Sequence, residues 1–279
     1  MPVIKEILLK DIPEKIIKDA MEDLRQYSVG FAKILDSPSG QDAVLLGSGT
    51  LVSVGSTRAV LTAHHVLSVL PTKGRLGLVL TDTQKATTFD TQGMVYLKIA
   101  RGIVDADGPD LGAVILAPSI AGTVGAQKAF YNLDLRREQM LQSPPDLRSG
   151  FWFINGYVDE FTMEGRGEHS GKIKRFYNLS GAGGPEGPNI IGDFDFFDFP
   201  ITDRSCVPES FGGMSGGGLW QVPLKLDADG QIKNQPPLLS GVVFYQEPTT
   251  DTICGVKCHG RQSVYRVAYD SIQNLPPHR

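Results

Sequence analysis

One serine in this sequence, Ser215, lies in a glycine-rich box whose chemistry is that of acyl transfer. The box is Gly213-Met214-Ser215-Gly216-Gly217. Glycine permits sharp backbone turns and lets a substrate come close to the main chain. In such a turn two backbone N–H groups can point into one small hollow. There they stabilise the oxyanion that forms when a serine hydroxyl attacks a carbonyl. The box therefore makes Ser215 a candidate nucleophile.

A serine hydroxyl is a weak nucleophile at neutral pH and needs a base to accept its proton. Histidine suits this task because its unperturbed pKa is about 6.5, and a carboxylate on its other nitrogen orients the ring and offsets its charge. Both groups occur upstream of the serine. His65 lies in Leu61-Thr62-Ala63-His64-His65-Val66, and Asp110 precedes the apolar run that ends at Leu116. A site built from these three residues is expected in the cleft between two halves of the chain.

The elements that must position these residues are short strands. The alternating patterns predict strands at 29–35, 43–54, 58–62, 75–80, 94–100 and 111–116, and then at 151–154, 172–177, 193–199, 217–221, 239–245 and 263–268. Turn residues separate them, and the chain has 32 Gly and 18 Pro, which favours an all-β protein. Residues 181–188 are expected to form a Gly/Pro-rich loop.

Four segments follow from these patterns. Residues 1–27 form an N-terminal helical extension, with Asp11 as its N-cap and Pro13 in its first turn, packed on the domain or on a regulatory partner. Residues 28–130 form a first β-barrel with His65 and Asp110. Residues 131–149 are a polar linker, and 150–279 form a second barrel with Ser215 and a short C-terminal helix at 269–275.

The three pieces resemble the trypsin-like (chymotrypsin-fold) serine endopeptidases. The resemblance rests on the box around Ser215, on the two segments around His65 and Asp110, on Gly47-Ser48-Gly49-Thr50-Leu51-Val52-Ser53 and on Ser263-Val264-Tyr265-Arg266-Val267. It implies two packed six-stranded antiparallel β-barrels. It also implies that His65 is the general base, Asp110 its orienting carboxylate and Ser215 the nucleophile, with the N–H groups of Gly213 and Ser215 as the oxyanion hole. The predicted reaction is peptide-bond hydrolysis in a protein or peptide substrate.

Several residues compete for these roles. His64 is the rival base, and the family's pattern favours His65 because Val66 follows it directly. Asp105 and Asp107 are rivals of Asp110, which alone is followed directly by an apolar strand. The box also departs from many secreted members, which have an aspartate before the serine that pairs with an N-terminal amine released by cleavage. Here that position is Met214, as expected of HtrA-type and other non-secreted relatives.

The resemblance also implies a pocket for the residue before the scissile bond. Its expected lining is Glu209 at the base, Ser210 beside it, Ser263 opposite, and the strand Phe244-Tyr245-Gln246. A carboxylate at the base favours Arg or Lys in the substrate, because a guanidinium binds it through two hydrogen bonds. The alternative is that Glu209 points to solvent, with no effect on specificity.

Composition narrows the function classes. The net charge of −4 argues against a nucleic-acid or anionic-membrane partner. Three cysteines, Cys206, Cys254 and Cys258, form neither a disulfide framework nor a zinc pattern. The reaction as predicted needs no metal or organic cofactor. Neither a signal peptide nor a transmembrane stretch is visible, so a cytoplasmic location is expected.

Two other functions fit parts of the sequence. One is a catalytically silent protease fold that binds peptides, or a protease that acts only when a partner gates it. The other is an esterase on an α/β-hydrolase scaffold, but there the serine precedes the acid and the histidine in the chain. Here the serine comes last, and no alternating strand–helix pattern is visible, so this alternative is disfavoured.

Overall fold

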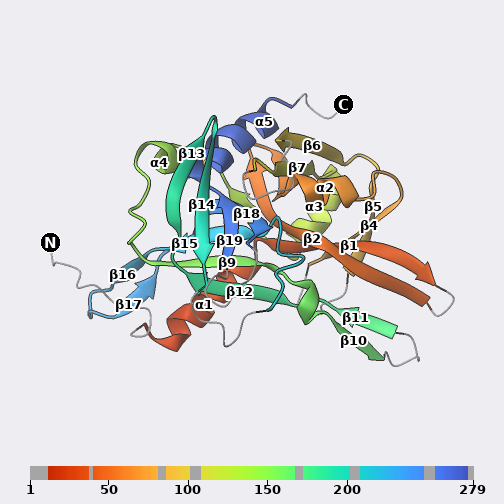
Figure 1. Cartoon of the computed structure of the whole chain (residues 1–279), viewed down its shortest axis with the longest axis horizontal. Helices are drawn as coiled ribbons and strands as arrows, with labels where there is room; N and C mark the ends of the chain where they lie inside the picture. The colour runs from red at the N-terminus through yellow and green to blue at the C-terminus, as the bar shows by residue number, and fades with distance from the viewer. Residues whose placement is uncertain are drawn as a thin grey trace.

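Two antiparallel sheets form the body of the protein, one from each half of the chain (Figure 1). The computed structural model describes residues 12–37, 40–80, 86–100, 108–166, 172–201, 208–247 and 255–275. Within these ranges no helix combines the length and the apolar character that crossing a bilayer requires. Five residues discussed above lie outside the described ranges: Asp11, Asp105, Asp107, Cys206 and Cys254.

The first sheet has eight strands in the order β5-β4-β1-β2-β3-β7-β6, with β8 added beside β2. Neighbouring strands are antiparallel except β2 and β8, which run parallel. The bounds are β1 (Ser28–Ser37), β2 (Gly40–Val54), β3 (Thr57–Thr62), β4 (Arg75–Val79), β5 (Ala86–Asp90), β6 (Val95–Ala100), β7 (Leu111–Ile115) and β8 (Tyr131–Asn132).

The second sheet has seven strands in the order β12-β9-β15-β18-β19-β14-β13, and two hairpins, β10-β11 and β16-β17, extend from this half. The bounds are β9 (Phe151–Tyr157), β10 (Met163–Arg166), β11 (Lys172–Arg175), β12 (Asn178–Gly183), β13 (Glu186–Ile191), β14 (Phe194–Pro200), β15 (Gly218–Val222), β16 (Leu224–Leu226), β17 (Ile232–Asn234), β18 (Leu238–Gln246) and β19 (Gly255–His259). The predicted all-β class with antiparallel sheets is confirmed. The sheets have eight and seven strands instead of six each, and their edge strands do not pair to close them within the described ranges.

The apolar runs in these strands are nearly continuous because each strand packs on both faces. Along β9, Phe151 and Phe153 face the core shared by the two sheets, whereas Trp152 and Ile154 face a core inside the second half. All five residues of β7 are buried, and its side chains also divide between two cores. Leu111, Ala113 and Ile115 pack in the shared core, whereas Val114 packs in the core that lies mostly inside the first half. The side-chain period of two divides each such run between two cores.

In the described ranges, six helical segments surround the sheets, besides a single turn at 159–161. They are α1 (Glu14–Arg25), α2 (His64–Val69), α3 (Pro118–Gly125), α4 (Arg137–Gln142), the π-helical segment η3 (Ser263–Ala268) and α5 (Tyr269–Gln273). The expected linker at 131–149 is therefore partly structured. It contributes β8 to the first sheet and α4, whose Met140 is buried.

Two element predictions are wrong. Residues 181–188 are not a loop, because they contain the end of β12 and the start of β13. Residues 263–268 form η3 and not a strand, and the last strand of the sheet is β19. The cause at 263 is a cap: the carboxylate of Asp195 accepts hydrogen bonds from the N–H groups of Gln262 (3.0 Å) and Ser263 (2.7 Å). Buried Val264, Ala268 and Ile272 then recur every four residues, which is helical spacing.

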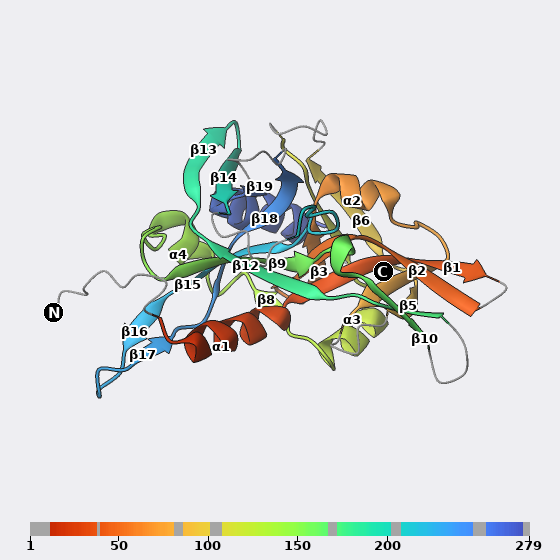
Figure 2. The ribbon, with the colours of Figure 1, turned by 60° about the horizontal axis from the view of Figure 1, so that its bottom comes forward.

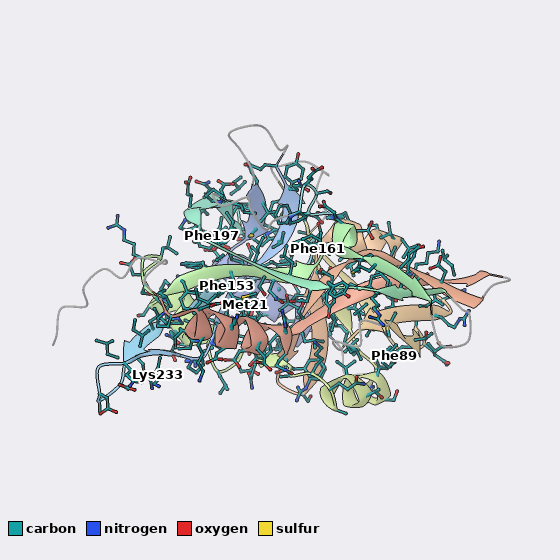
Figure 3. All side chains as sticks on the ribbon, turned by 90° about the horizontal axis from the view of Figure 1, so that it is seen from below. Met21, Phe89, Phe153, Phe161, Phe197 and Lys233 are labelled. Carbon is teal, nitrogen blue, oxygen red and sulfur yellow. The ribbon has the colours of Figure 1, made fainter. Side chains whose placement is uncertain are left out.

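The N-terminal helix α1 packs on this chain's own core. Its described part begins after Pro13, which occupies the N-cap position with no side-chain hydrogen bond. Ala20 and Leu24 are buried in the shared core, and Met21 packs against it near Phe153 (Figure 3). The helix lies beside the β16-β17 hairpin (Figure 2), where the side-chain amide of Asn234 donates to a carbonyl of α1 at 2.7 Å. The apolar face of α1 is thus occupied within the chain.

We expect Leu24→Ala to lower the free energy of unfolding by about 2–5 kcal/mol, because it leaves a cavity where a fully buried leucine stood. Chemical denaturation measures this loss. Lys18→Ala serves as the matched control on the same helix. Its ion pair with Glu14 joins side chains that are 70% and 80% exposed, so the change should be below about 1 kcal/mol. An equal effect of both substitutions would contradict the packing of α1 on the core.

Candidate active site

The structure brings His65 and Asp110 into direct contact. The His65 ring Nδ1 lies 2.5 Å from Asp110 Oδ2, and the His65 backbone N–H donates to Asp110 Oδ1 at 2.9 Å. His65 is the second residue of α2, which begins directly after β3, and Asp110 immediately precedes β7, the neighbour of β3. One carboxylate thus fixes both the ring and the backbone of this histidine. Of the two adjacent histidines, it is His65 and not His64 that bonds Asp110.

The environment of Asp110 keeps its carboxylate ionised. Burial by itself would raise the pKa, since the residue is only 4% exposed. The hydrogen bonds from His65 and the charge of its protonated ring outweigh burial, so the pKa of Asp110 lies below its ordinary value. The carboxylate is therefore negative at neutral pH. It can hold the proton on Nδ1 of His65, which leaves Nε2 of the neutral ring as the basic nitrogen.

A third residue, His259, fixes the backbone of Asp110. Its Nε2 accepts the Asp110 backbone N–H at 3.0 Å, so the neutral ring carries its proton on Nδ1. The ring is fully buried among Phe194, Phe196 and Phe244, with the Phe244 centroid at 4.8 Å. This burial lowers the pKa of His259 to about 4. The sequence alone does not reveal His259, because its partner is 149 residues away and no local pattern marks it.

Ser215 lies in a tight turn that starts at a left-handed residue. The φ angle of Gly213 is +91° and that of Gly216 is +92°, a region that favours glycine. Within the described chain, the backbone N–H groups of Gly213 and Ser215 donate to no protein acceptor. The N–H of Met214, between them, donates to Phe211 O at 2.9 Å. Two N–H groups on either side of Met214 are thus available to a ligand.

The turn lies against the first sheet at the middle of β2, beside α2. A Cβ added at Gly47 would lie 2.7 Å from Val66 and 3.3 Å from the Ser215 carbonyl oxygen. The residue after His65 and the backbone of Ser215 therefore meet at one point. The hydroxyl of Ser215 is directed elsewhere, since it donates to the Phe244 carbonyl at 3.4 Å. Among the hydrogen bonds of the described residues, none joins Ser215 to His65.

Met214 fills an apolar space behind the turn. It is 1% exposed and packs in the core of the second half with Trp152, Phe211 and Leu219. Its sulfur occupies space that a side chain at Gly156 or Gly217 would need. A Cβ added at Gly156 would lie 2.6 Å from the sulfur, and one added at Gly217 would lie 3.1 Å from it. A buried apolar side chain therefore occupies the position that holds an ion-pairing aspartate in many secreted members of the resembled family.

The loop before the turn is held by side-chain hydrogen bonds. The carboxylate of Glu160 accepts from the N–H groups of Glu209 (3.2 Å) and Ser210 (2.9 Å). From the other side, the amide of Gln246 accepts from Phe211 N–H at 2.8 Å and donates to the Glu209 carbonyl at 3.4 Å. Glu209 and Ser210 are exposed, while Tyr245 and Gln246 are half-buried. Glu160 is a second acidic residue at this loop that the sequence analysis did not single out.

The side chains of two residues of the expected pocket are buried. Ser263 is fully buried at the start of η3, where its hydroxyl bonds the backbone and carboxylate of Asp195. In this structure Ser263 bonds within the fold, and its expected place in the pocket stays a prediction. Phe244 is 2% exposed and its ring packs on Phe196 and His259, so only its backbone carbonyl reaches Ser215.

No group of three or more His, Cys, Asp or Glu side chains in the described ranges has a metal-binding arrangement. Cys258 is a buried free thiol, and burial raises its pKa. This thiol lies in the core of the second half.

The buried histidine predicts a pH dependence of stability. The folded-state pKa of His259 is about 4, below the ordinary value of 6.5, so its neutral form stabilises the fold above pH 6.5 and that contribution is lost as the pH falls towards 4. We expect the wild type to lose stability relative to His259→Gln over this range, by up to about 1.4 kcal/mol per pH unit. Urea denaturation at several pH values measures it. Asp110 titrates in both proteins, so its contribution cancels in the comparison. If the free energy of unfolding of wild type and of His259→Gln changed with pH in parallel, the role of buried His259 would be contradicted.

Comparison with known proteins gives structural likeness only. No family model matches the sequence, and no curated protein sequence matches it. Many solved structures resemble the chain. One is the Drosophila clip serine protease Grass of the Toll pathway, at 12% identity with a TM-score of 0.53 over 97% of this chain and 73% of that one. Another is the inactive form of a serine-to-alanine mutant of Rv3671c from M. tuberculosis, at 14% identity with a TM-score of 0.45 over 99% of this chain and 98% of that one. A third is the HtrA-type protease AlgW with a decapeptide, at 16% identity with a TM-score of 0.44 over 92% of this chain and 67% of that one.

At these identities a structural match speaks to the fold and not to the activity. The likeness to Grass exceeds a TM-score of 0.5 and covers both halves of the chain. The chain itself has two antiparallel sheets, one from each half. It has a chymotrypsin-like fold.

Proposed function

We propose that this protein is a serine endopeptidase that hydrolyses peptide bonds through an acyl-enzyme on Ser215. The observation that carries the proposal is the double hydrogen bond between His65 and Asp110. The buried carboxylate binds the ring and the backbone of a histidine whose side chain is 34% exposed, and it fixes the ring while leaving Nε2 free of that carboxylate. That arrangement suits a general base better than a structural contact, because the ring is not buried.

Each group has a defined role in the proposed reaction. His65 accepts the hydroxyl proton of Ser215 as the oxygen attacks the substrate carbonyl, and Asp110 stabilises the imidazolium that forms. The N–H groups of Gly213 and Ser215 bind the carbonyl oxygen as it becomes negative. His65 then donates its proton to the leaving amine. Water attacks the acyl-enzyme in the second half of the cycle, with His65 again accepting and returning a proton, and the acid product leaves.

The serine must rotate before it can react. Its hydroxyl donates to the Phe244 carbonyl at 3.4 Å, a long and therefore weak hydrogen bond. In the proposed mechanism, rotation about the Cα–Cβ bond releases this acceptor and directs the hydroxyl to His65 Nε2. Hydrogen bonds of a reacting group are often long or misdirected without substrate and tighten when substrate binds. The roles proposed here need no metal or organic cofactor.

We propose Arg or Lys as the preferred residue before the scissile bond. Two carboxylates, Glu160 and Glu209, lie at the loop that precedes the nucleophile. The carboxylate of Glu160 is engaged by two backbone N–H groups, so Glu209 is the one whose charge is available to a substrate cation. A guanidinium or ammonium group would pair with it.

The second candidate function is a peptide-binding module without turnover, or an enzyme that a partner switches on. The orientation of the Ser215 hydroxyl towards Phe244 favours it, because that serine is not bonded to a base. The difference between the two functions lies in whether the hydroxyl becomes nucleophilic. A reagent that reacts only with an activated serine distinguishes them.

We expect a fluorophosphonate probe to label the wild-type protein at Ser215, as located by peptide mass mapping. His65→Gln should abolish labelling, because no base then accepts the serine proton. Ser215→Ala should lower kcat on a casein or fluorogenic peptide substrate by a factor of about 10⁴ or more. Thermal unfolding checks that both variants remain folded.

The exposed Ser68, three residues after His65 on α2, provides the control. Ser68→Ala should retain labelling and activity, since its hydroxyl bonds only the His64 carbonyl in the described structure. Absence of labelling in folded wild type would support the binding module, and labelling that appears only with an added partner would support gating.

We expect Glu209→Gln to lower kcat/KM for peptides with Arg or Lys before the scissile bond, by about tenfold or more, and to leave peptides with Leu there nearly unchanged. The physical reason is the loss of a charge-assisted contact to the substrate cation. A peptide library that varies only this position measures the preference. A wild-type preference for small apolar side chains would exclude the role of Glu209 and leave the endopeptidase proposal intact.

A further inference from the structure

The turn around Ser215 is held through all of its carbonyl groups. Each of the four carbonyls from Gly212 to Ser215 accepts a hydrogen bond. The donors, in chain order, are the Asp159 N–H (2.8 Å), the Ser48 hydroxyl (2.6 Å), the Gly217 N–H (2.8 Å) and the Ser48 N–H (2.8 Å). Ser48 is the only one of these donors that comes from the first sheet, and it donates twice.

A peptide group is planar, and its C=O and N–H point in opposite directions. The bond to Gly212 O therefore directs the N–H of Gly213, and the bond to Met214 O directs the N–H of Ser215. The weak point is Gly213 itself, because glycine can rotate between many backbone conformations. Asp159 holds the peptide before Gly213 and the Ser48 hydroxyl holds the peptide after it. Together they fix the φ of +91° that orients the first N–H.

The Ser48 hydroxyl is itself fixed in direction. Ser48 is fully buried on β2, and its oxygen accepts the backbone N–H of Tyr157 at 2.7 Å. With this donor on one side, the hydroxyl hydrogen is directed to a carbonyl. The Gly213 carbonyl lies at 2.6 Å, nearer than the Tyr157 carbonyl at 3.3 Å. The Ser48 hydroxyl thus connects Tyr157 of β9, in the second sheet, to Gly213 of the turn, although Ser48 itself lies on β2 of the first sheet.

We propose that Ser48 is a positioning residue that holds the two N–H donors of the turn ready for the oxyanion in the intact chain. This inference rests on the endopeptidase function proposed above. Two observations support it together. Ser48 clamps the turn on both sides of the nucleophile, at Gly213 O and Ser215 O, and the buried Met214 offers no charge for an N-terminal amine to pair with. The turn is therefore ordered from within the fold, and cleavage of the N-terminus is not required to form it.

The test is Ser48→Ala, compared with Ser240→Ala. Ser240 is also fully buried, and its hydroxyl also joins two polar groups, the Leu238 carbonyl and the Arg261 side chain. We expect Ser48→Ala to lower kcat by about 10- to 100-fold, less than the 10²–10³ typical when one oxyanion donor is removed. Both N–H groups remain, as do the bonds from Asp159 and Gly217 that direct them, and within the turn only the peptide after Gly213 loses its hydrogen bond. KM should change less than threefold, and Ser240→Ala should retain the wild-type kcat.

Two binding measurements separate positioning from folding. Affinity for a peptidyl boronate, whose tetrahedral oxygen occupies the oxyanion position, should fall in Ser48→Ala by about the same factor as kcat. Affinity for an uncleaved peptide, measured in the Ser215→Ala background with and without Ser48→Ala, should not change. If Ser48→Ala does not fold, Ser48→Cys replaces it, because a thiol is a weak donor of similar shape and should give an intermediate loss of kcat.

The outcomes are distinct for the two proposals. Wild-type kcat and boronate affinity in Ser48→Ala would overturn the role of Ser48 and leave the endopeptidase proposal standing. An equal loss of kcat in Ser240→Ala and Ser48→Ala would also overturn it, since the effect would then be one of general stability. Folded wild type that neither reacts with fluorophosphonate nor cleaves any peptide would overturn both.

Discussion

The close approach of two backbones at the seam between the sheets is the constraint on which the rest of the structure depends. On one side lies the middle of β2, at Gly47 and Ser48, and on the other the turn around Ser215. A Cβ at Gly216 would collide with the Ser48 carbonyl and the Thr62 hydroxyl, and one at Gly47 would overlap Val66. Only residues without a side chain allow the strand, α2 and the turn to meet. The glycines of the box are thus needed for packing as much as for the turn.

This approach couples the halves of the chain. His65 and Asp110 come from the first sheet and Ser215 from the second, yet both halves contribute to every part of the site. His259 of β19 holds the backbone of Asp110, and Ser48 of β2 holds the turn of Ser215. A movement of one half relative to the other would break these bonds together. The shared apolar core, which includes α1, η3 and α5, stabilises the relative position of the sheets.

The electrostatics of the site follow from unequal burial. Asp110 is buried but well supplied with donors, so it stays charged, whereas His259 is buried among aromatic rings and stays neutral. His65 lies between them and solvent, with its side chain 34% exposed. Neutral His259 can accept the Asp110 N–H without adding a second positive charge beside His65. The site thereby holds one carboxylate and one exposed imidazole, which is what general-base chemistry requires.

The sequence by itself determined the antiparallel all-β class, most strands around the site and the candidate residues His65, Asp110 and Ser215. These depend on local patterns: alternation of apolar side chains, glycine around one serine, and an acid before an apolar strand. It missed strands such as β5, β13 and β19. It failed at Ser263, whose apolar neighbours fit a strand and a helix equally, until the Asp195 carboxylate capped the segment. It could not identify His259, Glu160 or Ser48 as part of the site. Their partners lie 149, 49 and 165 residues away, and hydrogen bonds of that range are set by how the sheets pack. The direction of the Ser215 hydroxyl was likewise decided only in three dimensions, because a side-chain rotamer depends on the acceptors that folding places around it.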